Sequence, residues 1–228
     1  MPALRAPFDL SVYLVVGPGD CRGRPVAEVV AAALRGGVTL VQLRDKEASS
    51  GAFLALGREL KALCREAGVP FIVNDRVEAA VALDADGLHV GQEDLDAGAA
   101  RAAIGPGRLL GLSVHAPEQL AGLEPGCVDY LGVGPVFATN SKADARPAGG
   151  AEGIALIRRA SALPIVAIGG LTAQRVPVPL GAGADGVAVV SAIAGAQDPA
   201  AATRELVEAV AETRRPGRGA STSRPGRR

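Results

Sequence analysis

The segment Gln42-Leu43-Arg44-Asp45-Lys46 combines one amide with two cations at alternate positions. Alternate side chains of an extended chain point the same way, so Gln42, Arg44 and Lys46 project together. Such a group can bind a diphosphate, and a guanidinium can do so through two parallel hydrogen bonds. The segment also fits an exposed, charged strand end in which Arg44 and Asp45 pair with neighbours. Spacing alone does not separate these two interpretations.

Two acidic residues follow successive apolar runs further along the chain. Asp75 comes directly after PFIVN, and Asp94 comes shortly after GLHV. Mg2+ prefers oxygen ligands and is usually held by one or two carboxylates with substrate phosphates and water. The two acids, placed opposite the Arg/Lys group, predict a metal–diphosphate site. Asp75 also suits the N-cap of a following helix, and the two roles are compatible.

A second group of residues suited to phosphate lies in the last third of the chain. The loop 134–150 exceeds the ~2–6 residues usual between a strand and its helix. It carries Thr139, Ser141 and Lys142. Loops of this kind are often lids, and the clustered hydroxyls favour a lid over a surface insertion. Gly169-Gly170 and Ser191 follow later apolar runs, where many barrels bind phosphate. The metal–diphosphate site and this second phosphate site together predict a transferase with a diphosphate leaving group.

No residue of the sequence has the setting of a covalent nucleophile. Ser113 ends an apolar run, but no acid stands at a recognisable spacing from it. His89 lies within an apolar run and His115 in a loop, and we interpret both as structural or supporting residues. The expected reaction therefore needs no covalent intermediate with the protein.

Short apolar runs alternate with helical patterns along the chain, and they predict the elements that position these residues. The expected strands are 12–16, 38–43, 70–73, 87–90, 109–113, 128–133, 164–168 and 186–190. The expected helices are 25–36, 49–67, 76–83, 96–104, 117–123, 151–161, 172–182 and 198–213. Eight strands, each followed by a helix, predict an α/β fold, a single-domain (β/α)8 TIM barrel over 1–213. A doubly wound open sheet is the alternative, but no GxGxxG opens the first helix.

Composition narrows the class of protein. Hydrophobic residues make up 48% of 228 residues and aromatic residues only 3%, which argues against a base-stacking nucleic-acid surface. Three separated cysteines support neither a disulfide framework nor a zinc site. The N-terminus has no signal pattern, and no apolar run reaches the ~20 residues of a membrane span. We expect a cytoplasmic protein with a disordered Arg/Gly/Pro/Ser-rich tail at 214–228.

The order of six segments resembles the thiamine-phosphate synthase family. They are QLRDKEAS, VNDRVEAAVALDADGLHVGQEDL, GLSVH, GVGPVFATNSKADA, PIVAIGG and GADGVAVVSAI. The resemblance covers roughly residues 11–210 and implies a TIM-barrel transferase of thiamine biosynthesis. Such an enzyme joins hydroxymethylpyrimidine diphosphate to a thiazole phosphate with Mg2+. Diphosphate departs to leave a pyrimidine-methyl cation, which the thiazole nitrogen attacks.

The resemblance also implies a role for each matching residue. Residues matching the pyrimidine-diphosphate site are Gln42, Leu43, Arg44, Asp45, Lys46, Asn74, Ser113 and Lys142. Those matching the thiazole-phosphate site are Thr139, Ser141, Gly170, Val190 and Ser191. Asp75 and Asp94 match the Mg2+ ligands, and Arg44, Lys46, Ser113 and Lys142 are the expected catalytic residues. Ser141 stands where the family commonly has Thr, which keeps the hydroxyl.

Three other functions share some of these sequence features. A thiazole tautomerase shares the barrel, but it typically has Asn-Gly in place of Asn74-Asp75, lacks the second acid, and has His where Pro135 stands. A phosphate-sensing barrel would not need the pair Asp75 and Asp94. Nucleic-acid binding would rely on the Arg-rich tail. We expect small-molecule substrates as the partners, with no nucleic acid and no membrane, and leave a homo-oligomer open.

Overall fold

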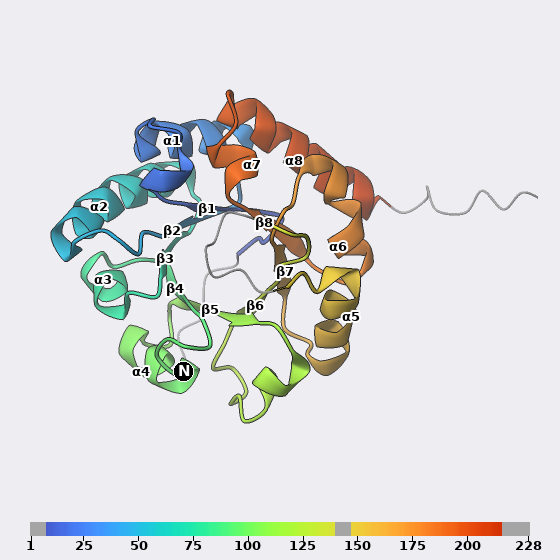
Figure 1. Cartoon of the computed structure of the whole chain (residues 1–228). Helices are drawn as coiled ribbons and strands as arrows, with labels where there is room; N and C mark the ends of the chain where they lie inside the picture. Colours follow the sequence, from blue (N-terminus) through green and yellow to red (C-terminus); the bar gives the residue numbers. More distant parts are fainter. Residues whose placement is uncertain (1–7, 140–146, 216–228) are drawn as a thin grey trace, which may run out of the picture.

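A computed structural model describes residues 8–139 and 147–215. Within them eight parallel strands close into a barrel, with every strand hydrogen-bonded to its sequence neighbours and β1 to β8 (Figure 1). The strands are β1 Val12–Val16, β2 Leu40–Leu43, β3 Phe71–Asn74, β4 Gly87–Val90, β5 Leu109–Val114, β6 Tyr130–Val133, β7 Ile165–Ile168 and β8 Gly186–Val189. The predicted (β/α)8 TIM barrel is confirmed.

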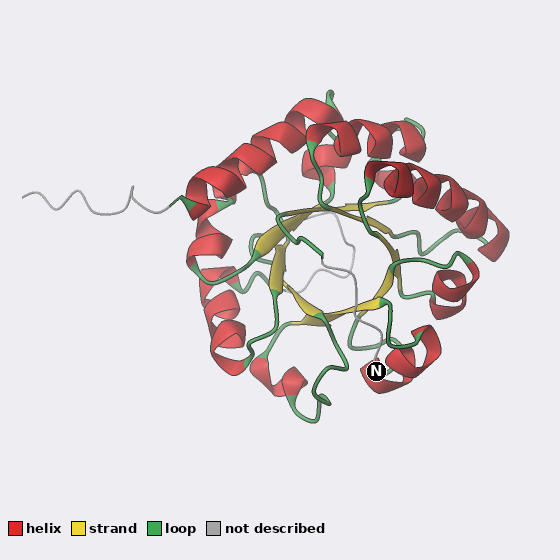
Figure 2. Cartoon of the chain, turned by 180° about the vertical axis from the view of Figure 1, so that it is seen from behind, coloured by secondary structure: helices red, strands yellow, loops and turns green. Residues whose placement is uncertain are grey.

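Helices surround the barrel on its outside (Figure 2). They are α1 Val26–Gly36, α2 Ser50–Ala67, α3 Val77–Ala82, α4 Ala97–Ile104, α5 Gly150–Ala160, α6 Pro177–Gly181, α7 Ser191–Ala194 and α8 Pro199–Arg214. In the described part of the chain, no helix has the length and apolar character needed to cross a membrane.

The structure corrects the expected helices in three places. The segment 117–123 forms only a 3-10 helix, Pro117–Leu120, because Gly122 soon follows with a φ of 77° that ends any helix. The segment 172–182 is divided into a 3-10 turn and α6, which begins at Pro177. The four-residue helix α7 was not predicted, since so short an apolar stretch has no helical period. The expected disordered tail 214–228 is wrong at its first residue, because Arg214 ends α8 and donates to the Ser11 hydroxyl at 2.7 Å. Residues 216–228 lie outside the described residues.

Alternate side chains of each strand pack on opposite faces of the barrel wall. Outward residues such as Leu14 and Leu43 join the large core between strands and helices. Inward residues form a second, smaller core in the barrel itself: Leu10, Tyr13, Val15, Leu40, Ile72, Leu109, Tyr130, Val166 and Ala188. This inner core contains both tyrosines of the chain, so two hydroxyl groups are buried beneath the barrel mouth.

A repeated contact joins the strands in pairs at their N-terminal ends. The residue before each even-numbered strand accepts a hydrogen bond from a main-chain N–H at the start of the preceding strand. Thr39 accepts from Val12 at 3.0 Å, Asp86 from Phe71 at 2.8 Å, Asp129 from Leu110 at 2.7 Å and Asp185 from Ile165 at 2.8 Å. Arg101 pairs with buried Asp129 at 2.6 Å, and Arg158 pairs with Asp185. Ala-Asp-Gly occurs at the start of both β4 and β8, at 85–87 and 184–186, and this contact explains its Asp.

Candidate active site

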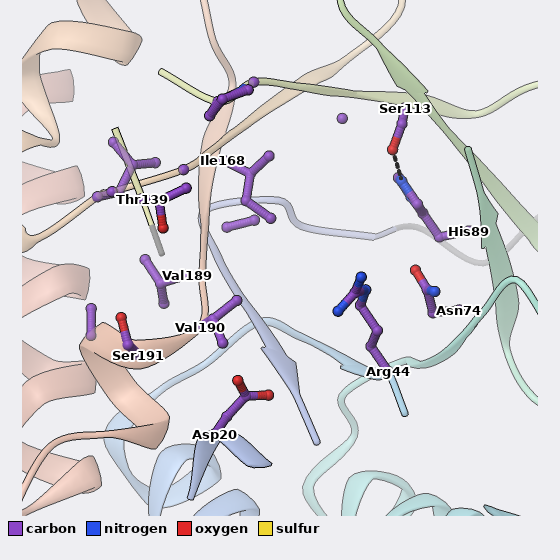
Figure 3. Close-up of a pocket in the computed structure, with 18 of the residues that line it drawn as sticks. Asp20, Arg44, Asn74, His89, Ser113, Thr139, Ile168, Val189, Val190 and Ser191 are labelled. Atoms are coloured by element: carbon purple, nitrogen blue, oxygen red, sulfur yellow. Dashed lines mark hydrogen bonds between the residues drawn. The ribbon is translucent and has the colours of Figure 1, made fainter. Parts of the chain in front are cut away.

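The C-terminal ends of the strands surround an open cavity of about 850 Å³, within the ~300–1,000 Å³ typical of small-molecule sites. Figure 3 shows side chains entering it from opposite sides of the barrel. Ten of the residues predicted for the site line this cavity: Arg44, Lys46, Asn74, Asp75, Asp94, Ser113, Thr139, Gly170, Val190 and Ser191. The structure therefore brings these ten residues together around one cavity.

Arg44 and Lys46 line the cavity just beyond β2. The Arg44 main-chain N–H donates to the Val16 carbonyl oxygen at 2.9 Å, which extends the β1–β2 pairing past the end of the strand. Gly17 permits this approach, because a Cβ at this position would lie 2.2 Å from the Arg44 carbonyl oxygen. The Arg44 side chain enters the cavity near Asn74 (Figure 3). Strand pairing thus fixes the base of the predicted cationic group.

Arg76 holds the loop that carries Lys46. Its Nη2 lies 3.0 Å from the carbonyl oxygen of Asp45, 3.3 Å from that of Lys46 and 2.7 Å from that of Ala48. The guanidinium carbon also stands 4.6 Å from the centre of the Phe53 ring on α2. One cation therefore binds three carbonyl groups of the short segment 45–48. Sequence reasoning missed this residue, since its partners are main-chain atoms some 30 residues away.

Asp75 and Asp94 bring two carboxyl groups together at the rim. Burial and the neighbouring Asp94 carboxyl raise the pKa of Asp75 to about 6, while Lys46 and Arg44 act in the opposite direction. Asp94 also accepts a hydrogen bond from the Gly91 main-chain N–H at 2.7 Å. Asp75 has a φ of 60°, which is uncommon for a residue other than glycine. Helix α3 has Arg76 at its N-cap with no side-chain cap, so the capping role for Asp75 is wrong.

Ser113 in β5 and His89 in β4 lie within hydrogen-bonding distance of each other. His89 Nε2 lies 3.0 Å from Ser113 Oγ (Figure 3), and His89 Nδ1 lies 3.1 Å from the Tyr130 hydroxyl. A serine is activated as a nucleophile by a base that a third group orients, usually a carboxylate. The third group here is a tyrosine hydroxyl with a pKa raised well above its usual value by burial. The arrangement therefore suits hydrogen bonding by Ser113 better than covalent catalysis.

The opposite side of the cavity is formed by the loops after β6, β7 and β8. Thr139, Val190 and Ser191 lie there together (Figure 3). Gly170 has a φ of 63°, and a Cβ on it would lie 2.7 Å from the Ala138 carbonyl oxygen. The close approach of these loops requires glycine at this position. Ser141 and Lys142 lie outside the described residues.

Three residues predicted to bind substrate lie off the cavity wall. The Gln42 side chain points into the barrel interior, is 3% exposed, and donates from Nε2 to the Tyr13 hydroxyl at 2.6 Å. Leu43 points outward into the core beneath the helices, as the alternation of the strand requires. The Asp45 carboxylate accepts main-chain hydrogen bonds from Glu47 and Ala48, both at 3.1 Å.

Several cavity residues were not predicted from the sequence. Asp20 and Arg22 follow β1, and Arg175 follows β7. Asp20 accepts a hydrogen bond from the Gly17 N–H at 2.9 Å, and burial raises its pKa. Arg175 donates to the Gly170 carbonyl oxygen at 2.6 Å, with its guanidinium 4.7 Å from the Phe137 ring centre. Examining the residues after the first strand, as after the others, would have identified Asp20 and Arg22.

Comparison with known proteins assigns a family to this arrangement. A family model described as thiamine monophosphate synthase matches residues 12–193. The thiamine-phosphate synthase of Azorhizobium caulinodans is 48% identical over 209 residues, which cover 92% of this chain and 99% of the relative. That of Geobacillus kaustophilus is 51% identical over 210 residues, covering 90% and 94%.

Solved structures agree with the sequence comparison. A thiamine phosphate pyrophosphorylase from Pyrococcus furiosus superimposes with a TM-score of 0.81 at 39% identity, covering 90% of this chain and 96% of that one. A structure titled native KDPGal has a TM-score of 0.66 at 15% identity and shares the fold alone.

Proposed function

Because the chain belongs to the thiamine monophosphate synthase family, we propose that its cavity joins hydroxymethylpyrimidine diphosphate to thiazole phosphate, forming thiamine phosphate and diphosphate. The enzyme is a transferase that acts on small molecules. The observation that supports this reaction best is the meeting of Arg44 and Lys46 with Asp75 and Asp94 in one cavity. Cations and a metal-binding acid pair are what a diphosphate leaving group needs.

The acid pair fits a divalent cation. Burial and the neighbouring Asp94 carboxyl both raise the pKa of Asp75, so ionising Asp75 beside Asp94 costs free energy. A bound cation would remove this cost. We propose that Asp75 and Asp94 hold Mg2+ with oxygens of the diphosphate and water. When bound, the ion would neutralise charge that develops on the leaving group.

The remaining steps rely on the residues of the chain. The bond between the pyrimidine methylene and the diphosphate oxygen breaks, and the electron pair leaves with diphosphate. Arg44 and Lys46 stabilise that charge, and we assign the same role to Lys142. The thiazole nitrogen then donates its lone pair to the methylene carbon to form the new C–N bond. The protein aligns the two substrates and excludes competing water, so no covalent intermediate with the protein is required.

We assign the two halves of the cavity to the two substrates. Asn74 and Ser113 would contact the pyrimidine, with Gln42, Leu43 and Asp45 shaping the segment around Arg44. The thiazole phosphate would bind at the opposite side, contacting Thr139, Ser141, Gly170, Val190 and Ser191. We further propose a cytoplasmic enzyme whose barrel domain is formed by residues 1–213. Arg214 belongs to this domain as well, as the last residue of α8. We propose small-molecule substrates as its partners, with no nucleic acid and no membrane.

Purified protein given both substrates tests the function directly. We expect thiamine phosphate and an equal amount of diphosphate in the presence of Mg2+, and no product after addition of EDTA. Restoring Mg2+ should restore turnover. Folded protein that forms no thiamine phosphate under any of these conditions would contradict the proposal, and tautomerase activity would then be measured on the same sample.

A further inference from the structure

A chain of hydrogen bonds crosses the barrel interior from β2 to β5. Gln42 Nε2 lies 2.6 Å from the Tyr13 hydroxyl, which lies 2.9 Å from the Tyr130 hydroxyl. Tyr130 continues to His89 Nδ1 at 3.1 Å, and His89 Nε2 reaches Ser113 Oγ at 3.0 Å. Four contacts thus connect a buried amide to a serine that lines the cavity.

Counting donors gives the direction of these hydrogen bonds, on the premise that each hydroxyl hydrogen is donated to the next group in the series. The Gln42 amide donates to Tyr13, so the hydrogen of the Tyr13 hydroxyl is left for Tyr130. Tyr130 then has one hydrogen to give, and its remaining partner is His89 Nδ1. A nitrogen that accepts a hydrogen bond carries no proton. His89 is therefore neutral, with its proton on Nε2.

The tautomer of His89 decides what Ser113 can offer. The Nε2–H donates to Ser113 Oγ and occupies one lone pair of the serine. The serine's own hydrogen is then free of the histidine and can be donated into the cavity. If these hydrogen bonds ran in the opposite direction, Ser113 would donate to His89 and present only lone pairs to a substrate.

The surroundings keep the network in place. Tyr13 and Tyr130 are 1% and 0% exposed, and burial raises the pKa of both, so both hydroxyls stay protonated. The His89 and Tyr130 rings lie 5.5 Å apart between centroids. Gly111 provides the space, because a Cβ there would lie 2.4 Å from His89 Nδ1 and 2.2 Å from Tyr130 Cζ.

We propose that His89 is a positioning residue of the reaction, which as the Nε2–H tautomer sets Ser113 to donate its hydroxyl hydrogen to an acceptor of the pyrimidine substrate. Tyr130, Tyr13 and Gln42 hold His89 in that tautomer. An aminopyrimidine ring nitrogen is an acceptor of the required kind. This inference rests on the proposed function, because it takes the pyrimidine diphosphate as the ligand of Ser113.

The tautomer can be read directly, since the chain contains only two histidines. Full-length protein labelled with 15N-histidine should show His89 with a protonated Nε2 and an unprotonated Nδ1, the second imidazole being assigned with His115→Gln. Tyr130→Phe removes the donor to Nδ1 and should shift His89 toward a mixture of tautomers. A proton on Nδ1 in the unmodified protein would overturn the inference, whether or not the enzyme is active.

A kinetic cycle separates positioning from a purely structural effect. Loss of one buried hydrogen bond predicts that Tyr130→Phe lowers kcat by roughly 3- to 10-fold. In a Ser113→Ala background the same change should have almost no further effect, because the group it positions is gone. The KM for thiazole phosphate should stay constant. Equal losses in both backgrounds would overturn the inference.

Thr203→Val is the matched control for removal of a buried hydroxyl. Thr203 is fully buried and donates to the Pro199 carbonyl oxygen at 2.7 Å, far from the cavity in helix α8. Its replacement should leave kcat and the His89 signals unchanged. Unmodified protein that shows the expected tautomer but makes no thiamine phosphate would contradict the proposed function. It would also overturn the role of His89 in the reaction, while the assignment of its tautomer would stand. The wrong tautomer in an active enzyme would overturn this inference alone.

Discussion

Replacing Arg76 by alanine should weaken both the fold and the binding of the pyrimidine diphosphate. Arg76 Nη2 contacts three carbonyl oxygens in the loop after β2. One terminal nitrogen carries two hydrogens, so at most two of these contacts reach full strength. Hydrogen bonds from a charged donor contribute ~1.5–3 kcal/mol each, and partial exposure of Arg76 reduces that. We expect a loss of about 2–4 kcal/mol, which lowers the Tm of a domain of this size by ~5–15 °C.

Release of this loop should also displace Lys46. A shift of about 1 Å in a charged binding group can cost up to ~100-fold in rate, so we expect the KM for the pyrimidine diphosphate to rise at least ~10-fold. Thermal unfolding and diphosphate release measure the two effects. Arg58→Ala, on the exposed face of α2, is the matched control and should change neither. If Arg76→Ala has the Tm and KM of the unmodified protein, the loop is held by other contacts and the reasoning is wrong.

Three further predictions follow from the same structure. Gly111→Ala would place a Cβ 2.2 Å from Tyr130 Cζ. The resulting overpacking should lower the free energy of unfolding by ~1–3 kcal/mol and lower kcat. A denaturant midpoint equal to that of the unmodified protein would contradict this. Asp75→Asn should raise the Mg2+ requirement at least ~10-fold yet raise the Tm in EDTA; a lower Tm would show that the two acids do not repel. The reason for this sign is that the folded pKa of about 6 exceeds the ordinary 3.8, so the metal-free protein loses stability as pH rises through that interval. Asp185→Ala should lower the Tm, because Ile165 N–H and Arg158 both lose a partner; activity per folded molecule, measured by active-site titration, should stay constant.

The sequence predicted the strands and the rim residues well, because both depend on local patterns. Apolar runs mark the strands, and residues just beyond them must reach the rim of a parallel barrel. The position of Leu43 could also have been deduced, since alternation places it opposite Gln42. The hydrogen bonds of His89 and Tyr130 could not, because they join residues 41 positions apart. The same holds for Arg76, whose partners are backbone atoms that no sequence motif distinguishes.

The four contacts that Thr39, Asp86, Asp129 and Asp185 make with the preceding strands divide the molecule into an assembly end and a chemical end. Each joins an even-numbered strand to the odd-numbered strand before it. The eight strands are thereby grouped into four pairs, or modules, each joined at its N-terminal end. The register of every module is set far from the loops that bind substrate. We therefore expect the loops at the chemical end to tolerate changes of length, while the modules continue to specify how the barrel closes.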